Sequence, residues 1–176
     1  MELYFIRHGE AEERGHGIPG EDAGRRLVRR GIKETRTVAQ ALDTLKVRPA
    51  VILTSPLVRA RETAEVLADH IRHAPAPVEV GALAPGGRWS DVRKAVEQHL
   101  KQARIRSKAV PCVFLVGHQP DMGRLILEAC AGARGALDVS KSACVGLAWK
   151  SGTMEQGAAR ICLALEPDHA ARIKTK

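Results

Sequence analysis

Short apolar runs alternate with longer amphipathic stretches along this chain of 176 residues. Leu3 to Ile6, Val51 to Leu53 and Cys112 to Val116 are brief apolar runs with branched or aromatic side chains, which are typical of buried strands. Between Leu27 and Leu45 apolar residues recur at helical spacing, which predicts a helix that packs along one stripe. Pro49 ends this helical pattern shortly before the second predicted strand.

Three further segments have helical character. The first follows Ser55 and Pro56, because serine can cap a helix and proline suits its first turn, and it extends to about Ile71. The other two extend from Trp89 to Ile105 and from Asp121 to Ala131. Each helical segment is separated from the next by a predicted strand or by a loop.

The remaining segments complete an alternating pattern. Ala74 to Gly87 is rich in proline and glycine and predicts a loop, with a short strand from Val78 to Val80. Ala143 to Trp149 and Ala159 to Leu165 predict two final strands, with Gly152 in the turn between them. This order predicts a three-layer α/β fold, with a mainly parallel central sheet and helices on both faces. We expect a single domain over residues 1–176, since the length suits one domain and no repeat or linker divides it.

The composition narrows the class of protein. The hydrophobic fraction of 44% is ordinary for a globular chain, and no apolar run approaches the roughly 18 residues of a membrane span. The N-terminal apolar stretch is too short for a signal peptide, so we expect a cytoplasmic protein with no membrane partner. The net charge of +8 favours acidic or phosphorylated partners. Aromatic residues make up only 3% of the chain, which argues against a nucleic-acid surface that stacks bases.

The cysteines and histidines lack the spacings of metal sites. The four cysteines are Cys112, Cys130, Cys144 and Cys162, and none forms a C-x-x-C pair. Each lies in an apolar segment, so we expect small buried side chains rather than a zinc site or a redox pair. The histidines show no ligand spacing either, and we therefore expect no metal and no cofactor.

Two basic or glycine-rich patterns have ordinary interpretations. The densest basic cluster comprises Arg25, Arg26, Arg29 and Arg30. We interpret it as a solvated helix face, and we expect Arg61 to lie on the surface too. Gly15 to Gly20 matches G-x-G-x-x-G, but no strand directly precedes it and Pro19 interrupts it, so we interpret it as a loop rather than a dinucleotide site.

The candidate chemistry lies where three predicted strands end. Arg7-His8 follows the first strand, Ser55 to Arg59 follows the second, and Gly117-His118 follows the strand that begins at Cys112. Ligands of open α/β sheets bind beyond the carboxyl ends of the strands, so these groups are expected to meet in one crevice. A neutral histidine can attack phosphorus, nearby arginines keep it unprotonated, and guanidinium forks match phosphate oxygens. The pattern therefore favours phosphoryl transfer.

These motifs resemble those of the histidine phosphatase superfamily. The similar segments are Arg7-His8-Gly9, Ser55-Pro56-Leu57-Val58-Arg59-Ala60 with Thr63-Ala64, and Gly117-His118-Gln119-Pro120. The short length, together with Leu27 to Gly31 and Leu83 to Gly87, is similar to the SixA-type phosphohistidine phosphatases. The resemblance implies a phosphoglycerate mutase-like fold in which His8 becomes phosphorylated. It implies a catalytic set of His8, Arg7, Arg59 and His118, with substrate contacts from Gly9, Ser55, Gly117 and Gln119.

One departure from the wider superfamily bears on the substrate. Many members place a carboxylic acid where this chain has Leu83 to Gly87, a stretch that contains no Asp or Glu. An alkoxide leaving group needs a proton from such an acid, whereas the imidazole of phosphohistidine leaves more easily. The sequence therefore favours a phosphoramidate substrate. Other acids could still fold over the site, and the candidates are Glu10, Glu12, Glu13 and Asp91.

We therefore predict a metal-independent phosphatase that dephosphorylates phosphohistidine on a protein. The expected partner is a phosphorylated protein, for example a histidine phosphotransfer domain, and the chain is expected to act as a monomer. One alternative is a phosphatase or mutase for a small phosphorylated metabolite. Another is a non-catalytic module that binds phosphate.

Overall fold

The computed structural model describes residues 1–13, 15, 21–103, 111–133, 135, 137–150 and 153–173. Within these residues the strands are β1 (Glu2–Arg7), β2 (Val51–Thr54), β3 (Val78–Glu79), β4 (Cys112–Gly117), β5 (Cys144–Ala148) and β6 (Arg160–Leu165). They form one sheet in the order β3-β2-β4-β1-β5-β6. The pairs β1 with β4, β2 with β4 and β2 with β3 are parallel, whereas β5 runs antiparallel to both of its neighbours.

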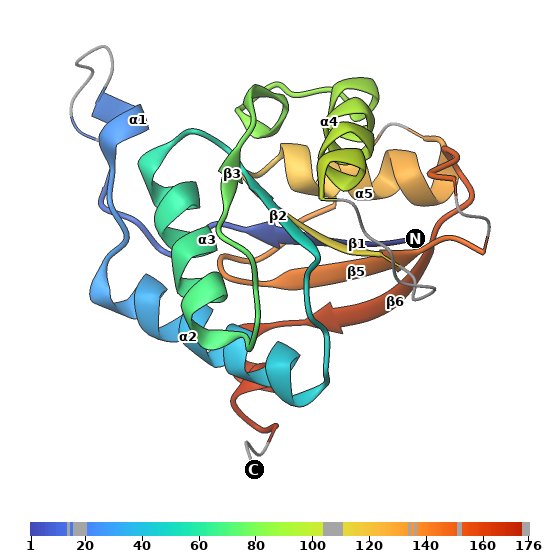
Figure 1. The fold of residues 1–176 in the computed structure, drawn as a ribbon. Coiled ribbons are helices and arrows are strands. Elements are labelled where there is room, and N and C mark those ends of the chain that lie inside the picture. The colour runs from blue at the N-terminus through green and yellow to red at the C-terminus, as the bar shows by residue number, and fades with distance from the viewer. Residues whose placement is uncertain are drawn as a thin grey trace.

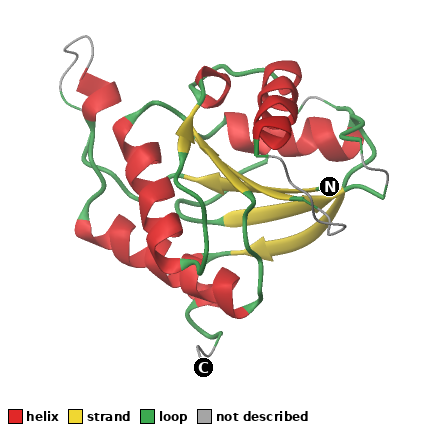
Figure 2. Cartoon of the chain, viewed as in Figure 1, coloured by secondary structure: helices red, strands yellow, loops and turns green. Residues whose placement is uncertain are grey.

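Helices cover both faces of this sheet (Figure 1). They are α1 (Glu21–Gly24), α2 (Arg29–Thr44), α3 (Val58–His70), α4 (Trp89–Gln102), α5 (Asp121–Ala131) and α6 (Pro167–Ala170), with a short 3-10 turn at Gly81–Leu83. Figure 2 shows the strands between the layer of α2 and α3 and the layer of α4 and α5. The predicted three-layer α/β fold with a mainly parallel sheet is confirmed.

Two apolar cores, one on each face, hold the layers together. Successive side chains of a strand point to opposite faces, so Leu3 and Phe5 of β1 join the core beneath α4 and α5. Tyr4 and Ile6 join the core beneath α2 and α3. Burial on both faces explains why the central strands are short, continuous apolar runs rather than alternating ones.

The structure corrects two helix starts. The first long helix begins at Arg29 rather than at Leu27, because Leu27 pairs with Ala11 in an isolated antiparallel bridge. The next helix begins at Val58 with Leu57 at its N-cap, so the predicted capping by Ser55 is wrong. The predicted turn at Gly152 and the predicted helix end at Ile105 lie outside the described residues.

The expectation that all four cysteines are buried is also wrong. Cys144 is buried, Cys112 and Cys130 are partly buried, and Cys162 is exposed. Cys162 lies on β6, which is an edge strand, so part of that strand faces solvent. All four cysteines are free thiols. Among the described residues, no helix has the length and apolar character needed to cross a bilayer.

The parallel pairing of β2, β4 and β1 brings the three motifs together. Because the three strands are adjacent and point the same way, their carboxyl ends lie at one edge of the sheet. Main-chain hydrogen bonds continue beyond the strands, from His8 N to the Gly117 carbonyl at 3.0 Å and from Ser55 N to the Val116 carbonyl at 2.9 Å. The loops that carry the candidate chemistry therefore start from a common rigid edge.

Gly31 allows α2 to approach the loop that follows His8. A Cβ atom at this position would lie 2.1 Å from the Glu10 carbonyl oxygen and 2.6 Å from the Glu10 nitrogen. Both atoms belong to the backbone, so they cannot rotate away as a side chain could. Gly31 is thus required for close packing of the helix against the loop, although glycine is otherwise unfavourable within a helix.

We predict that Gly31→Ala lowers the free energy of unfolding by about 1–3 kcal/mol, as expected for forced backbone displacement. The higher helix propensity of alanine would otherwise add roughly 1 kcal/mol of stability. Urea unfolding curves measure the difference. Gly81→Ala is the matched control, because nothing lies within 4 Å of its Cβ position. A Gly31→Ala protein as stable as the parent would contradict this account of the packing.

Candidate active site

His8 presents one specific ring nitrogen to the crevice. Its side chain is buried, and Nδ1 lies 2.7 Å from the Gly9 carbonyl oxygen. A carbonyl oxygen can only accept, so Nδ1 carries the proton and Nε2 keeps its lone pair. The Nε of Arg59 donates to Nε2 at 3.1 Å. The neutral ring is therefore oriented with its unprotonated nitrogen toward a cation.

The surroundings of His8 oppose its protonation. Burial is the largest cause that lowers its pKa to about 3, and the positive environment of His118, Arg59 and Arg7 acts in the same direction. The hydrogen bond to the Gly9 carbonyl opposes this shift but does not overcome it. At neutral pH the ring is thus uncharged, which is the form that can act as a nucleophile.

Arg59 links His8 to a segment that is distant in sequence. It lies in the first turn of α3 and is 3% exposed. Besides its bond to His8, its Nη1 donates to the Asp22 carbonyl at 2.6 Å, and its Nη2 donates to Asp22 Oδ2 at 3.1 Å. The guanidinium plane therefore lies between the imidazole of His8 and α1.

His118 lies beside His8. The two ring centroids are 5.1 Å apart, and His118 Nε2 is 2.7 Å from Ser55 Oγ. Burial lowers the pKa of His118 to about 4, and Arg59 adds to this effect, whereas Asp121 and Asp22 oppose it. Two neutral imidazoles from different strand ends are thus held next to one arginine.

Arg7 lies at the same edge of the sheet, but its side chain turns toward another loop. Its Nη1 donates to the Val139 carbonyl at 2.8 Å and lies 3.6 Å from Asp138, whose side chain is exposed. Its Nε is buried and has no hydrogen-bond partner within the described part of the chain. Arg7 therefore acts on His8 through its charge, which contributes to the lowered pKa of that ring.

The other predicted substrate contacts already bond within the protein. Gly9 N donates to Thr63 Oγ1 at 3.0 Å, and the Gly117 carbonyl accepts from His8 N. The Gln119 amide donates to the Leu137 carbonyl and accepts from Gly123 N. The structure thus places these residues in the loops of the site, while contact with substrate stays a prediction for each.

Two residues of the site, Asp22 and Arg25, were missed by sequence reasoning. Asp22 Oδ1 accepts from Arg25 Nε at 3.0 Å and Nη2 at 2.7 Å, while its other oxygen bonds Arg59. Partial burial raises the pKa of Asp22, but the hydrogen bonds and charges of Arg25 and Arg59 outweigh it and hold that pKa below its ordinary value. The sequence signal was only an acid and an arginine three residues apart.

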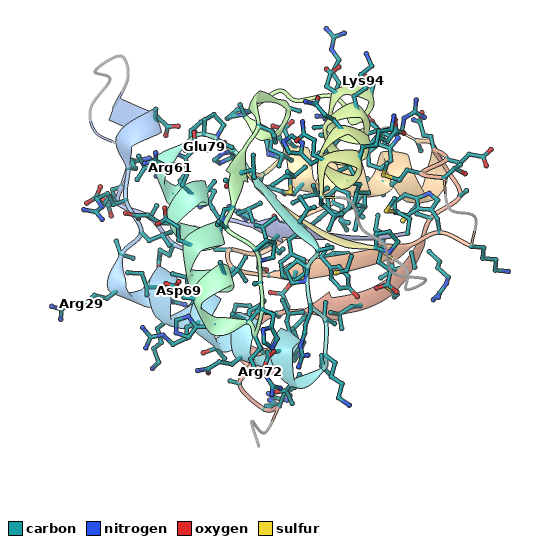
Figure 3. All side chains as sticks on the ribbon, in the orientation of Figure 1. Arg29, Arg61, Asp69, Arg72, Glu79 and Lys94 are labelled. Atoms are coloured by element: carbon teal, nitrogen blue, oxygen red, sulfur yellow. The ribbon has the colours of Figure 1, made fainter. Side chains whose placement is uncertain are left out.

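The basic cluster is therefore not one solvated helix face. The Arg25 side chain is only 14% exposed and lies before α2, whereas Arg29 projects outward from the start of that helix (Figure 3). Arg61 lies as expected near the surface and pairs with Glu79 at 3.4 Å (Figure 3). The segment Gly15 to Gly20 lies almost entirely outside the described residues.

The four acids that the sequence offered as candidate proton donors make other contacts or are exposed. Glu10 pairs with Lys141 at 3.4 Å, the carboxylate of Glu12 accepts from Arg26 N, and Glu13 and Asp91 are exposed. The loop Leu83 to Gly87 is held by Asp121, which accepts from Gly86 N at 2.8 Å. Among the described residues, no cluster of three or more His, Cys, Asp or Glu is arranged to hold a metal. The site is cationic, which suits an anionic group such as phosphate.

Comparisons with known proteins find similar sequences and folds among phosphatases. The family model described as "Histidine phosphatase superfamily (branch 1)" matches residues 3–83. The phosphohistidine phosphatase SixA of Escherichia coli is 32% identical over 133 residues, which are 75% of this chain and 76% of that protein. A structure of the protein histidine phosphatase SixA complexed with tungstate matches with a TM-score of 0.76 and 24% identity, over 96% of this chain and 98% of that one. The alpha-ribazole phosphatase from Shigella flexneri shares the fold, with a TM-score of 0.59 and 17% identity over 95% and 97% of the two chains.

The buried neutral histidines predict a specific dependence of stability on pH. The pKa of His8 falls from 6.5 to about 3 on folding, so below pH 6.5 the unfolded chain takes up a proton that the folded chain refuses. Stability then decreases as the pH falls toward 4, by up to about 1.4 kcal/mol per pH unit for each such histidine. We expect His8→Gln to reduce this slope by about that amount in urea unfolding experiments. Replacement of the exposed His169 by Gln is the control. If the free energy of unfolding of His8→Gln depends on pH as steeply as that of the parent, the pKa of His8 is not lowered.

Asp22 occupies donors of Arg59 that an anion would also need. We predict that Asp22→Asn, which keeps the shape but removes the charge, binds inorganic phosphate more tightly by roughly five-fold, or about 1 kcal/mol. Isothermal titration calorimetry measures the affinity, with Asp91→Asn as a control on an exposed acid of α4. Weaker binding by Asp22→Asn would mean that the carboxylate orients Arg59 rather than competing with the anion.

Proposed function

The chain belongs to the histidine phosphatase superfamily and is of the SixA type, and we propose that within this family it removes the phosphoryl group from phosphohistidine on a partner protein. One observation carries this proposal. His8 Nδ1 is bonded to the Gly9 carbonyl, and its unprotonated Nε2 lies 3.1 Å from the Arg59 Nε. A neutral nucleophile beside a phosphate-binding cation is the arrangement that attack on a phosphoryl group requires.

The proposed reaction has two steps. The lone pair of His8 Nε2 attacks phosphorus, and a P–N bond forms at His8. The P–N bond of the substrate breaks, and its imidazole, which takes a proton from solvent on its other ring nitrogen, leaves as the neutral ring. Water then attacks phospho-His8, releases inorganic phosphate and restores the neutral ring. The guanidinium of Arg59 and the imidazole of His118 would hold the phosphoryl oxygens in both steps, and Arg7 would add its positive charge beside them.

The acid–base properties of the site favour imidazole as the leaving group. Leu83 to Gly87 contains no acid, and the carboxylate that contacts the site, Asp22, is held ionised by Arg25 and Arg59. An ionised carboxylate has no proton to donate to a departing alkoxide. The imidazole of phosphohistidine departs with less assistance, so a phosphoramidate suits this site better than an ester.

The charge of the chain supports an acidic partner. A net charge of +8 would attract an acidic protein surface around the phosphohistidine, as on a histidine phosphotransfer domain in the cytoplasm. A small phosphate ester is the second candidate substrate, because a protein of the same fold is an alpha-ribazole phosphatase. A non-catalytic phosphate-binding role is disfavoured, since the nucleophilic nitrogen of His8 is kept unprotonated and is oriented by a hydrogen bond from Arg59.

We predict that the protein hydrolyses a phosphohistidine peptide much faster than a phosphoserine peptide or a sugar phosphate. Steady-state release of phosphate and acid-free trapping of the phosphoenzyme measure this. His8→Gln should lose both turnover and the trapped phosphoryl group, whereas the same replacement of the exposed His169 should retain them. Comparable hydrolysis of the esters would favour the second candidate. Binding of the peptide without release of phosphate would favour the non-catalytic role.

A further inference from the structure

The two ring nitrogens of His118 have very different surroundings. Nε2 lies 2.7 Å from Ser55 Oγ, whereas Nδ1 is buried and has no hydrogen-bond partner among the residues that the structure describes. The His118 side chain is 3% exposed, and Ser55 is fully buried. A buried polar nitrogen without a partner is rare in a folded protein and calls for an explanation, such as a ligand that completes it.

The contacts of Ser55 indicate which nitrogen of His118 carries the proton. Ser55 Oγ accepts from Leu57 N at 3.3 Å, so the remaining role of the hydroxyl is to donate its own proton. His118 Nε2 is the acceptor within reach. If Nε2 carried the proton instead, Ser55 Oγ would accept from two donors, and its own proton would have no acceptor among the described residues.

We propose that Ser55 is a positioning residue that holds His118 in the tautomer with its proton on Nδ1, so that this N–H donates to an oxygen of the transferred phosphoryl group. The inference rests on the proposed function, because it assigns the orphaned N–H to the substrate of that site. It also gives Ser55 a role different from direct contact with phosphate, since its hydroxyl is already used by Leu57 and His118.

The choice of tautomer matters because the ring is neutral. Burial lowers the pKa of His118 to about 4, so at neutral pH only one nitrogen carries a proton. A phosphoryl oxygen only accepts hydrogen bonds, and a lone pair on Nδ1 would repel it. A histidine held in the wrong tautomer loses its function even when its position is correct.

His8 and His118 thus form a complementary pair. Both are protonated on Nδ1, His8 through the Gly9 carbonyl and His118 through the Ser55 hydroxyl. His8 presents its lone pair at Nε2 for attack, while His118 presents its proton at Nδ1 for binding. The same tautomer therefore supplies the nucleophile on one ring and the donor on the other.

Side-chain nitrogen NMR of the histidines tests the assignment without any turnover. His118→Asn identifies the His118 signals by their loss. In the parent protein at neutral pH we expect His118 Nδ1 to be the protonated nitrogen, and in Ser55→Ala we expect the proton to shift at least partly to Nε2. A parent protein protonated on Nε2, or an unchanged tautomer in Ser55→Ala, would overturn the inference.

Kinetics with a phosphohistidine peptide supply the second test. Ser55→Ala should lower kcat roughly ten- to hundred-fold with a smaller change in KM. In many molecules of this variant, His118 would be protonated on Nε2 and would have no N–H at Nδ1 to donate to the phosphoryl group. Thr54→Val removes a neighbouring buried hydroxyl that donates to the Ser55 carbonyl, and it should leave kcat near the parent value. An equal loss in both variants would indicate a merely structural role for Ser55.

A double-mutant comparison separates this inference from general damage to the fold. The side-chain amide of His118→Asn can place an N–H near the position of Nδ1 without a tautomer to choose. Ser55→Ala in that background should therefore cost little further activity, and a full additional loss would contradict the inference. If no phosphatase activity is found but the tautomer shifts as expected, the proposed function fails while the assignment of Ser55 stands.

Discussion

The parallel pairing of β2, β4 and β1 is the constraint from which the rest of the site follows. Each strand ends at the same edge of the sheet, and hydrogen bonds from His8 N and Ser55 N to the carbonyls of Gly117 and Val116 continue the ladder into the loops. Because the ladder is buried between two apolar cores, the loop starts cannot shift relative to one another. The imidazoles of His8 and His118 therefore lie 5.1 Å between ring centres, although the residues are far apart in sequence.

Keeping His8 and His118 neutral in the folded protein lowers its stability. Two imidazoles are buried without charge beside Arg59, and this costs stability at any pH where the unfolded chain would protonate them. Functional sites commonly carry such a cost, which the rest of the fold must offset. Asp22 balances part of the positive charge by binding both Arg25 and Arg59, so the cations are held in place by a carboxylate. A phosphoryl group entering the site would meet donors that are already oriented.

The hydrogen-bond partners of the two histidines give each ring a different role. The Gly9 carbonyl leaves His8 with a lone pair facing Arg59, and the Ser55 hydroxyl leaves His118 with an N–H to offer. Neither role depends on a large change in pKa alone, because the identity of the protonated nitrogen is what distinguishes a nucleophile from a donor. The absence of an acid from Leu83 to Gly87 supports the proposed phosphohistidine substrate, whose leaving group needs little protonation.

The sequence by itself determined the layer architecture and the strand positions. It also predicted that Arg7, His8, Arg59 and His118 lie near one edge of the sheet. These features depend on local apolar patterns and on the rule that parallel strands share a carboxyl edge. Only the tertiary structure decided that Asp22 and Arg25 join Arg59, that Gly31 contacts the backbone of Glu10, and that Ser55 bonds His118 instead of capping a helix. Such contacts join segments whose local patterns carry no information about each other, since side-chain geometry is settled by packing and by which polar groups remain to be satisfied.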